Sequence, residues 1–316
     1  MAVSYRRGLH ELGDGLFAYL QPDGGWGWSN AGLVTSSGTS LLVDTLFDLR
    51  LTRQMLDALR PITDASPLQA AVNTHANGDH CFGNELLPEG VTIYGSSAAV
   101  EEMRAVPPAL VHLLLKTPEG KEPVFAEWAR ATFAPFTFED VELRVPSSTF
   151  DGRLDLRVGE RELSFIELGP AHTTSDSIVW VPDAGTVFTG DLLFIGGTPI
   201  AWQGPIQNWL DSCQRILALG AHTLVPGHGP VTDADGVHDV MRYLEYVRAE
   251  ARARFDAGMD AEAAADDIDL GEFAELGDRE RVAVNVETAY REFDPAREPA
   301  PVPELFARMA RWSARH

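Results

Sequence analysis

The chain has 316 residues, 45% of them hydrophobic and 23% charged, a composition typical of folded globular proteins. Its 47 acidic and 25 basic residues give a formal net charge of −22, which repels polyanions and argues against nucleic-acid binding. No run of about 18 apolar residues predicts a membrane span, and the N-terminus lacks the apolar core of a signal peptide. We therefore expect a cytoplasmic protein without nucleic-acid or membrane partners.

Short β-rich segments separated by turn residues occur along most of the chain, with helical periodicity between some of them. The predicted strands span residues 15–21, 30–35, 40–45, 68–73, 91–94, 153–158, 162–168, 177–181, 186–189 and 222–225. Helices are predicted at 207–219 and 237–257, and a further helix begins after Asp48 and stops before Pro61. Because the second half repeats the order of the first, we expect an α/β fold built from two similar halves.

Two regions depart from this pattern. Prolines interrupt segments rich in Leu, Phe and Trp between about residues 104 and 142, which predicts a largely helical insertion that acts as a lid or a pocket wall. Residues 258–316 contain many Ala, Asp and Glu, and we expect a C-terminal helical extension that packs on the surface. The main domain is accordingly predicted to span residues 1–257.

The loop between the first two predicted strands carries Trp26 and Trp28 at a glycine-rich tip. Most aromatic residues of the insertion are expected to pack it onto the rest of the fold. An indole on a flexible tip contributes less to a core, so we predict that Trp26 and Trp28 contact a small-molecule substrate that is hydrophobic or aromatic.

Side chains that bind metals gather where predicted strands end. The candidates are His75, Asn77, Asp79, His80, His172, Asp191 and His228. Any one of these histidines alone is more commonly a structural residue, but the agreement of several separate loops favours a metal site. Imidazole and carboxylate ligands without a cluster of thiolates suit Zn, Fe or Mn, and two such ions activate water for hydrolysis. The residues therefore predict a binuclear centre with hydrolase chemistry.

This pattern resembles the metallo-β-lactamase superfamily, whose signature His-x-His-x-Asp-His is followed by a distant His, Asp and His. The resemblance covers residues 10 to 255 and implies a four-layer αβ/βα sandwich of two similar halves. It also implies that Asp44 supports the metal loops from outside. The ligand set that it implies is His75, Asn77 and His172 for a first site, Asp79, His80 and His228 for a second, and Asp191 as the bridge.

Asn77 stands where the signature has its second histidine. An amide oxygen is a weaker zinc ligand than imidazole, so we expect the first site to have lost affinity. Two alternatives stay open: Asn77 coordinates or hydrogen-bonds a metal-bound water in a binuclear site, or the enzyme works with one tightly held ion. The predicted cofactor is one or two zinc ions, with iron or manganese as alternatives.

The sequence favours a hydrolase of a carboxylic ester, thioester or lactone, with Asp79 as the catalytic residue that orients the attacking water. The segments 21–26 and 74–80 also resemble motifs of the superfamily's aromatic polyketide cyclases, which implies aldol ring closure with the metal as a Lewis acid. A di-iron redox protein would use the same ligands. The sequence leaves the oligomeric state open, with a homodimer as one option.

Overall fold

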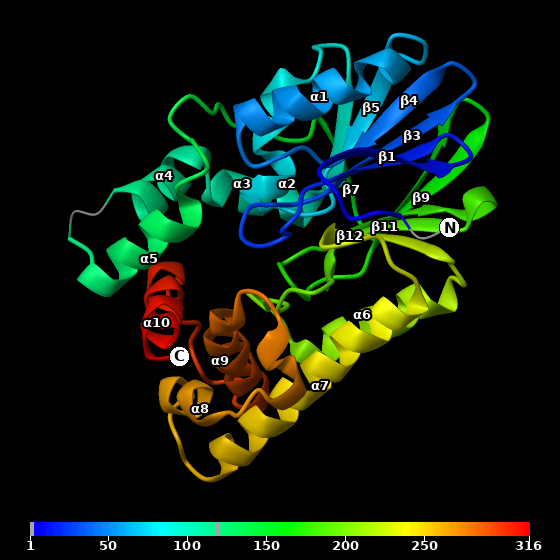
Figure 1. Cartoon of the computed structure of the whole chain (residues 1–316). Coiled ribbons are helices and arrows are strands. Elements are labelled where there is room, and N and C mark those ends of the chain that lie inside the picture. The colour runs from blue at the N-terminus through cyan, green and yellow to red at the C-terminus, as the bar shows by residue number, and fades with distance from the viewer. Residues whose placement is uncertain (1–2, 118–119) are drawn as a thin grey trace.

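The computed structural model describes residues 3–117 and 120–316. Two β-sheets pack face to face, and helices cover their outer faces (Figure 1). The apolar residues between the sheets include Leu41 and Val72 of the first sheet and Phe165, Val179 and Phe188 of the second. The prediction of an α/β fold with a four-layer sandwich is confirmed.

The first sheet follows the order of the sequence. Within the described residues its strands are β1 (Gly8–Gly13), β2 (Leu16–Leu20), β3 (Ala31–Ser36), β4 (Thr39–Val43), β5 (Leu68–Val72), β6 (Thr92–Ser96) and β7 (Ser148–Phe150). Strands β1 to β4 pair antiparallel, and β4 to β7 pair parallel. The sequence did not predict β1 and β7, the two edge strands. Every residue of β4 is buried, as expected for a central strand covered on both faces.

The second sheet has the order β12-β11-β10-β9-β8. Its strands are β8 (Arg153–Val158), β9 (Arg161–Glu167), β10 (Ser177–Val181), β11 (Thr186–Phe194) and β12 (Thr223–His228). Only the pair of β11 and β12 is parallel among the described strands of this sheet. Helix α6 (Ile206–Ala218) forms the crossover between them, as a parallel connection requires.

The described α-helices are α1 (Leu49–Thr63), α2 (Gly78–Cys81), α3 (Ser97–Ala105), α4 (Pro108–Lys116), α5 (Pro123–Phe133), α6 (Ile206–Ala218), α7 (Ala234–Asp256), α8 (Ala261–Asp267), α9 (Val282–Phe293) and α10 (Val302–Arg315). Asp48 caps α1 by accepting a hydrogen bond from the backbone N–H of Leu51 at 2.7 Å. The helix does not stop before Pro61, as predicted, but continues to Thr63. Pro61 lies in the last turn, where it removes one hydrogen bond only, and the next residue, Ile62, packs against the core.

Helices from two distant parts of the chain meet beside the sandwich. In Figure 1 the red α10 lies against the green α5, and the two helices are in contact. Arg311 of α10 ties them to the rest of the extension, because it contacts Glu122 next to α5 at 3.2 Å and Glu262 of α8 at 2.8 Å. Residues 134–142, the last part of the predicted largely helical insertion, contain no helix. None of the helices in the described ranges is long and apolar enough to cross a bilayer.

Candidate metal centre

Loops and strand ends from both sheets meet at one edge of the sandwich. They carry the seven predicted ligands, which are His75, Asn77, Asp79 and His80 after β5, His172 between β9 and β10, Asp191 in β11 and His228 at the end of β12. Crevices at the carboxyl ends of parallel strands are the usual place for such sites in α/β folds. The structure brings six of the seven into mutual contact through histidine nitrogens and carboxylate oxygens.

Asp191 lies inside β11 and not after a strand as predicted, because β11 continues to Phe194. The pairing of β11 with β12 is irregular on both sides of Gly190, whose φ of +51° suits glycine. Such an irregularity changes the direction in which neighbouring side chains point. On β12, a Cβ added to Gly227 would lie 1.9 Å from Oδ1 of Asp191, so this glycine leaves the space that the carboxylate occupies.

The carboxylate of Asp191 is at the centre of the cluster. Its Oδ1 lies 3.0 Å from Nε2 of His80. Its Oδ2 lies 3.3 Å from Nε2 of His172, 3.4 Å from Nε2 of His228 and 3.7 Å from Nε2 of His75. Four imidazoles therefore face one carboxylate, which is the placement that the resemblance implied for a bridging ligand.

The donor atoms form two groups in which all members lie within 4.8 Å of one another. The groups are Asp79, His80 and His228, and His75, His80 and Asp191. The group of Asp79, His80 and His228 contains the three residues that the resemblance implied for the second metal site. The other differs from the implied first site, because His75 is grouped with His80 and Asp191 instead of with Asn77 and His172.

Each histidine of the cluster turns its Nδ1 outward to a neighbouring oxygen. The contacts are Thr74 Oγ1 with His75 at 3.0 Å, Asp44 Oδ2 with His80 at 3.0 Å, the Ile200 carbonyl with His172 at 2.6 Å and the Gly24 carbonyl with His228 at 3.0 Å. A carbonyl oxygen requires a protonated Nδ1, which leaves Nε2 of the neutral ring as an acceptor or a metal ligand. Asp44 also accepts hydrogen bonds from the backbone N–H and the hydroxyl of Thr74, so it supports the loop as the resemblance implied.

Three buried atoms of the cluster make no hydrogen bond of acceptable geometry, although two of them lie 3.0 Å apart and polar groups in protein interiors almost always have a hydrogen-bond partner. They are Nε2 of His75, Nε2 of His80 and Oδ1 of Asp191. All three belong to one of the two donor groups, and imidazole nitrogen and carboxylate oxygen are ligands for zinc, iron and manganese. The residues present therefore fit a divalent metal ion.

Burial and the interactions between histidines and carboxylates shift the pKa values of the groups in the cluster. Burial lowers the pKa of His75 well below its usual value. For His80 and His228 burial acts in the same direction, but Asp191 and Asp79 outweigh it and raise the pKa, to about 9 for His228. Burial raises the pKa of both carboxyls, yet the neighbouring histidines lower it below the usual range. The carboxylates are thus held in the ionised form that binds metal.

Asn77 contacts the cluster through His172. Its Nδ2 lies 3.0 Å from Nε2 of His172, whose Nδ1 contacts the carbonyl of Ile200. The amide therefore donates to the lone pair of Nε2 in the neutral ring. A metal ion would compete with Asn77 for this lone pair, which agrees with the expected loss of affinity at the first site.

A cavity of about 290 Å³ lies beside the cluster. Five of the seven candidates line it, namely Asn77, Asp79, His172, Asp191 and His228. Apolar side chains from four regions form much of the wall, including Phe47 after β4, Leu114 and Leu115 of α4, Phe133 of α5, and Leu305 and Phe306 of α10. The predicted insertion and the predicted C-terminal extension thus both contribute wall residues to the cavity that contains the metal ligands.

Trp26 lines this cavity, as predicted for a substrate contact. Its ring is not on a free tip, because it packs against Trp128, Trp202 and Phe306 with ring centres about 6 Å apart. Its indole N–H donates to Oε1 of Glu280 at 2.8 Å.

The structure does not bring Trp28 to the wall of this cavity, and its contact with a substrate stays a prediction. Its ring packs 4.9 Å from the ring of Phe136, and the guanidinium of Arg7 lies 4.4 Å from its centre. The backbone N–H of Trp28 donates to the carbonyl of Gly25 at 3.0 Å and closes a turn through Trp26 and Gly27, so the two indoles point to different surroundings, which a count of aromatic residues on a loop does not reveal.

Sequence reasoning also missed Arg281, a fully buried residue that lines the cavity. Its guanidinium lies 4.3 Å from the ring centre of Trp26 and 5.2 Å from that of Phe194, whose ring in turn stacks on His228. An Arg in a region rich in charged residues gives no sequence signal of burial. The burial of Arg281 is recognised only from its contact with Trp26 in the folded chain.

A family model described as the metallo-beta-lactamase superfamily matches residues 24–228. Among curated proteins, the chain is 22% identical over 194 residues to 2,4-dinitroanisole O-demethylase subunit alpha of Nocardioides sp., which covers 60% of this chain and 48% of that subunit. It is 34% identical over 68 residues to hydroxyacylglutathione hydrolase of Rhodospirillum rubrum, which covers 22% of this chain and 26% of that enzyme.

Solved structures with this fold include the sec-alkylsulfatase Pisa1 from Pseudomonas sp., with a TM-score of 0.69, 17% identity, and coverage of 93% of this chain and 52% of that chain. DIM-1 metallo-beta-lactamase has a TM-score of 0.57 and 17% identity, and the match covers 78% of this chain and 97% of that chain. The present chain therefore spans about half the length of the O-demethylase subunit and of the alkylsulfatase.

Proposed function

The chain belongs to the metallo-beta-lactamase superfamily, and from this premise we propose that it is a metal-dependent hydrolase of a carboxylic ester, thioester or lactone. The observation that carries the proposal is the cluster around Asp191, in which four imidazole nitrogens face one carboxylate at the wall of a largely apolar cavity. The donor set suits zinc first, with iron or manganese as alternatives.

Divalent ions held by the two donor groups would lower the pKa of a bound water and polarise the carbonyl oxygen of the ester, thioester or lactone. Asp79 has a second task in this proposal. Its Oδ2 contacts Nε2 of His228 at 3.3 Å, whereas its Oδ1 has no hydrogen bond or ion pair within the described residues. Because Asp79 lines the cavity, Oδ1 is free to accept a hydrogen bond from the attacking water and so to orient it.

The wall of the cavity supports a substrate with a hydrophobic part. Trp26, Trp202 and Phe306 pack on one another and border the same space as the ligand residues. Binding an apolar group there releases water from these side chains and keeps bulk water from the reacting atoms. Among the relatives described above, one is named a hydroxyacylglutathione hydrolase and one an alkylsulfatase, names that agree with hydrolysis as the reaction class.

The test combines metal content with turnover. We expect the purified chain to contain at least one zinc, iron or manganese ion, to hydrolyse members of a panel of p-nitrophenyl esters, acyl thioesters and lactones, and to lose this activity on chelation. Adding back the metal should restore it. A metal-loaded chain that hydrolyses none of these classes would contradict the proposal. A product that gained no water would instead support ring closure, and visible absorption from bound iron would support a di-iron centre.

Asp79→Asn provides the matched variant. It keeps the size of the side chain but removes the charge that accepts a proton or a hydrogen bond from water. We expect kcat to fall by about 10²- to 10⁴-fold, the usual contribution of a positioned acid or base. Circular dichroism and metal analysis should show that the variant is folded and still binds at least one ion. Full activity in the metal-loaded variant would contradict the assigned role.

A further inference from the structure

Two arginines from the C-terminal extension line the cavity, and their charges are compensated differently. Nη2 of Arg281 lies 2.8 Å from Oδ2 of Asp278, so this guanidinium has a carboxylate partner. Arg291 of α9 has no carboxylate oxygen within 4 Å among the residues that the structure describes. A partly buried cation without a counter-ion is uncommon, because burial without pairing is costly.

Arg291 is held in place by neutral oxygens. Its Nη2 lies 3.0 Å from the carbonyl oxygens of Trp202 and Gln203 and 3.0 Å from Oγ1 of Thr288. Its Nε and Nη1 have no hydrogen-bond partner within residues 3–117 and 120–316. One side of the guanidinium is therefore anchored, and the other keeps donors that a ligand in the cavity can use.

The anchoring loop places Arg291 next to the metal cluster. The backbone N–H groups of Trp202 and Gln203 donate to the carbonyl oxygen of His172, at 3.0 and 3.3 Å, while the carbonyls of the same two residues accept from Arg291. One short loop thus connects a predicted metal ligand to the guanidinium. A substrate that reaches the metal ligands lies within reach of Arg291 as well.

Both acidic residues of α9, Glu287 and Glu292, are already paired, and Glu292, which follows Arg291, accepts a hydrogen bond from Arg248 at 2.7 Å. Glu287, one turn before Arg291 on α9, accepts two hydrogen bonds from Arg297 and one from Arg308, all at 2.8 Å. Neither carboxylate of α9 is thus left to pair with Arg291. At physiological ionic strength the net charge of −22 over the whole chain is screened beyond about 8 Å, so the groups within this distance decide which ligand binds beside Arg291.

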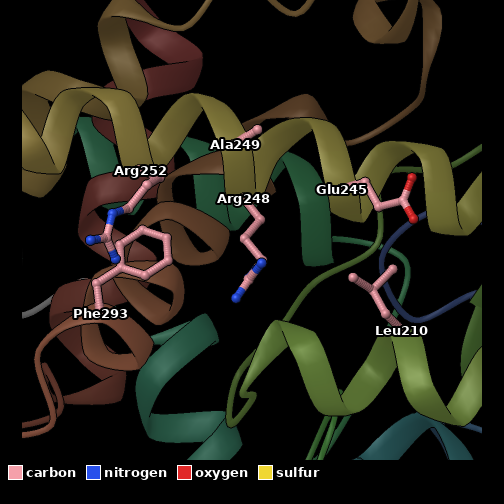
Figure 2. A pocket seen from close by; sticks show the side chains of 6 residues that line it. All are labelled: Leu210, Glu245, Arg248, Ala249, Arg252 and Phe293. Carbon is pink, nitrogen blue, oxygen red and sulfur yellow. The ribbon is translucent and has the colours of Figure 1, made fainter.

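A second cavity shows that unpaired arginines are not the rule in this chain. Figure 2 shows this cavity of about 320 Å³ between α6 and α7, with Arg248 and Arg252 beside Phe293. Arg248 donates to Glu292 at 2.7 Å, and Arg252 pairs with Asp256 at 3.0 Å. Both cations there are compensated, and nothing in that cavity calls for an anionic ligand.

We propose that Arg291 binds an anionic group of the substrate, so that the substrate class is a hydrophobic ester, thioester or lactone that also carries a carboxylate or a similar oxyanion. This inference rests on the proposed function for the bond that is cleaved, but it has a binding test of its own. Nε and Nη1 lie on different edges of the guanidinium, and each can donate a charge-assisted hydrogen bond to an oxygen of an anionic group.

The first test measures binding to the metal-free chain. The probes are octanesulfonate and octyl methyl sulfone, which share the apolar part and differ in charge, and the fluorescence of Trp26 and Trp202 in the cavity wall reports their binding. We expect the sulfonate to bind about tenfold to a hundredfold more tightly than the sulfone, the usual effect of a charge-assisted hydrogen-bonded pair. Arg291→Gln should remove this preference and leave sulfone binding unchanged.

Two further variants separate charge from structure. Arg252→Gln removes the same charge outside the cavity and should leave the preference for the sulfonate intact. Arg291→Lys should keep part of it, because lysine supplies the charge on a flexible stem without the planar, fixed donors of the guanidinium. An equal loss of affinity for both probes in Arg291→Gln would mean that Arg291 only supports the wall, and an unchanged preference would equally overturn the proposal.

The second test measures turnover by the metal-loaded chain. p-Nitrophenyl hexanoate is compared with the p-nitrophenyl monoester of adipic acid, which adds a terminal carboxylate. We expect Arg291→Gln to raise KM for the adipate ester by about tenfold to a hundredfold more than KM for the hexanoate ester. If neither ester is cleaved, the proposed function fails for these substrates, whereas the binding test still decides the role of Arg291.

Discussion

The metal cluster and the cavity wall beside it are built in opposite ways. In the cluster, the four histidines are each held by a contact of Nδ1 with an oxygen outside the cluster, as His80 is by Asp44. In the wall, apolar rings from the loop at Trp26, from α5 and from α10 pack without directional bonds, apart from the indole N–H that reaches Glu280. The difference indicates that reaction chemistry and substrate choice are encoded in separate segments, so that each can change while the other is kept.

The strongest test of this separation is Asp44→Ala. The substitution removes the acceptor of His80 Nδ1 and of two donors of Thr74, so we expect metal affinity to fall by about 10- to 100-fold, as for other partners of metal ligands. Competition with a chromophoric chelator measures the change. Asp48→Ala is the control, because Asp48 is equally buried but caps α1, and its loss should lower stability only. Equal metal affinity in the two variants would contradict the special role of Asp44.

A smaller effect is expected from Asn77→His. The substitution replaces a donor to His172 Nε2 with a second imidazole, so the competition for that lone pair ends and the first site gains a ligand. We expect affinity for an additional ion to rise by at least about tenfold, on the scale of changes near metal ligands. Elemental analysis of ions per chain provides the measurement. An unchanged metal content at limiting zinc would show that Asn77 already serves as well as histidine.

The smallest effect distinguishes the two indoles. Trp26→Ala should raise KM for a hydrophobic ester by roughly three- to tenfold, the worth of one or two aromatic contacts, without changing the metal content. Trp28→Ala should leave KM unchanged, because Trp28 packs on Phe136 outside the cavity. Both variants should unfold at a lower temperature, which makes each a control for the other. Equal KM values in the two variants would indicate that Trp28 contacts the substrate as Trp26 does.

Local sequence patterns predicted much of the sandwich. The strands at 153–158 and 177–181 have the predicted bounds, because alternating side chains and flanking turn residues set them locally. The ligand candidates could be predicted for a related reason, because several of them lie within a few residues of one another at predicted strand ends. The edge strand β7, with three residues only, is too short to give such a signal.

What the sequence did not predict depends on contacts between distant segments. Pro61 stays helical because Ile62 packs on the core, a tertiary effect that overrides a local preference. The burial of Arg281 and the position of Arg291 on the cavity wall require residues 26, 202 and 291 to meet. A single sequence has no periodicity or motif that predicts contacts between distant segments. The residues that line the cavity can therefore be identified only in the folded chain.

The position of α10 in the chain has a consequence for biosynthesis. Every predicted metal ligand precedes α10 by about seventy residues or more, yet Leu305 and Phe306 of α10 form part of the wall beside these ligands. At about 5–20 residues per second, a ribosome needs several seconds to translate the intervening segment. During this interval the nascent sandwich presents its histidines without that wall, which gives a metal ion an open route to them before the last helix arrives.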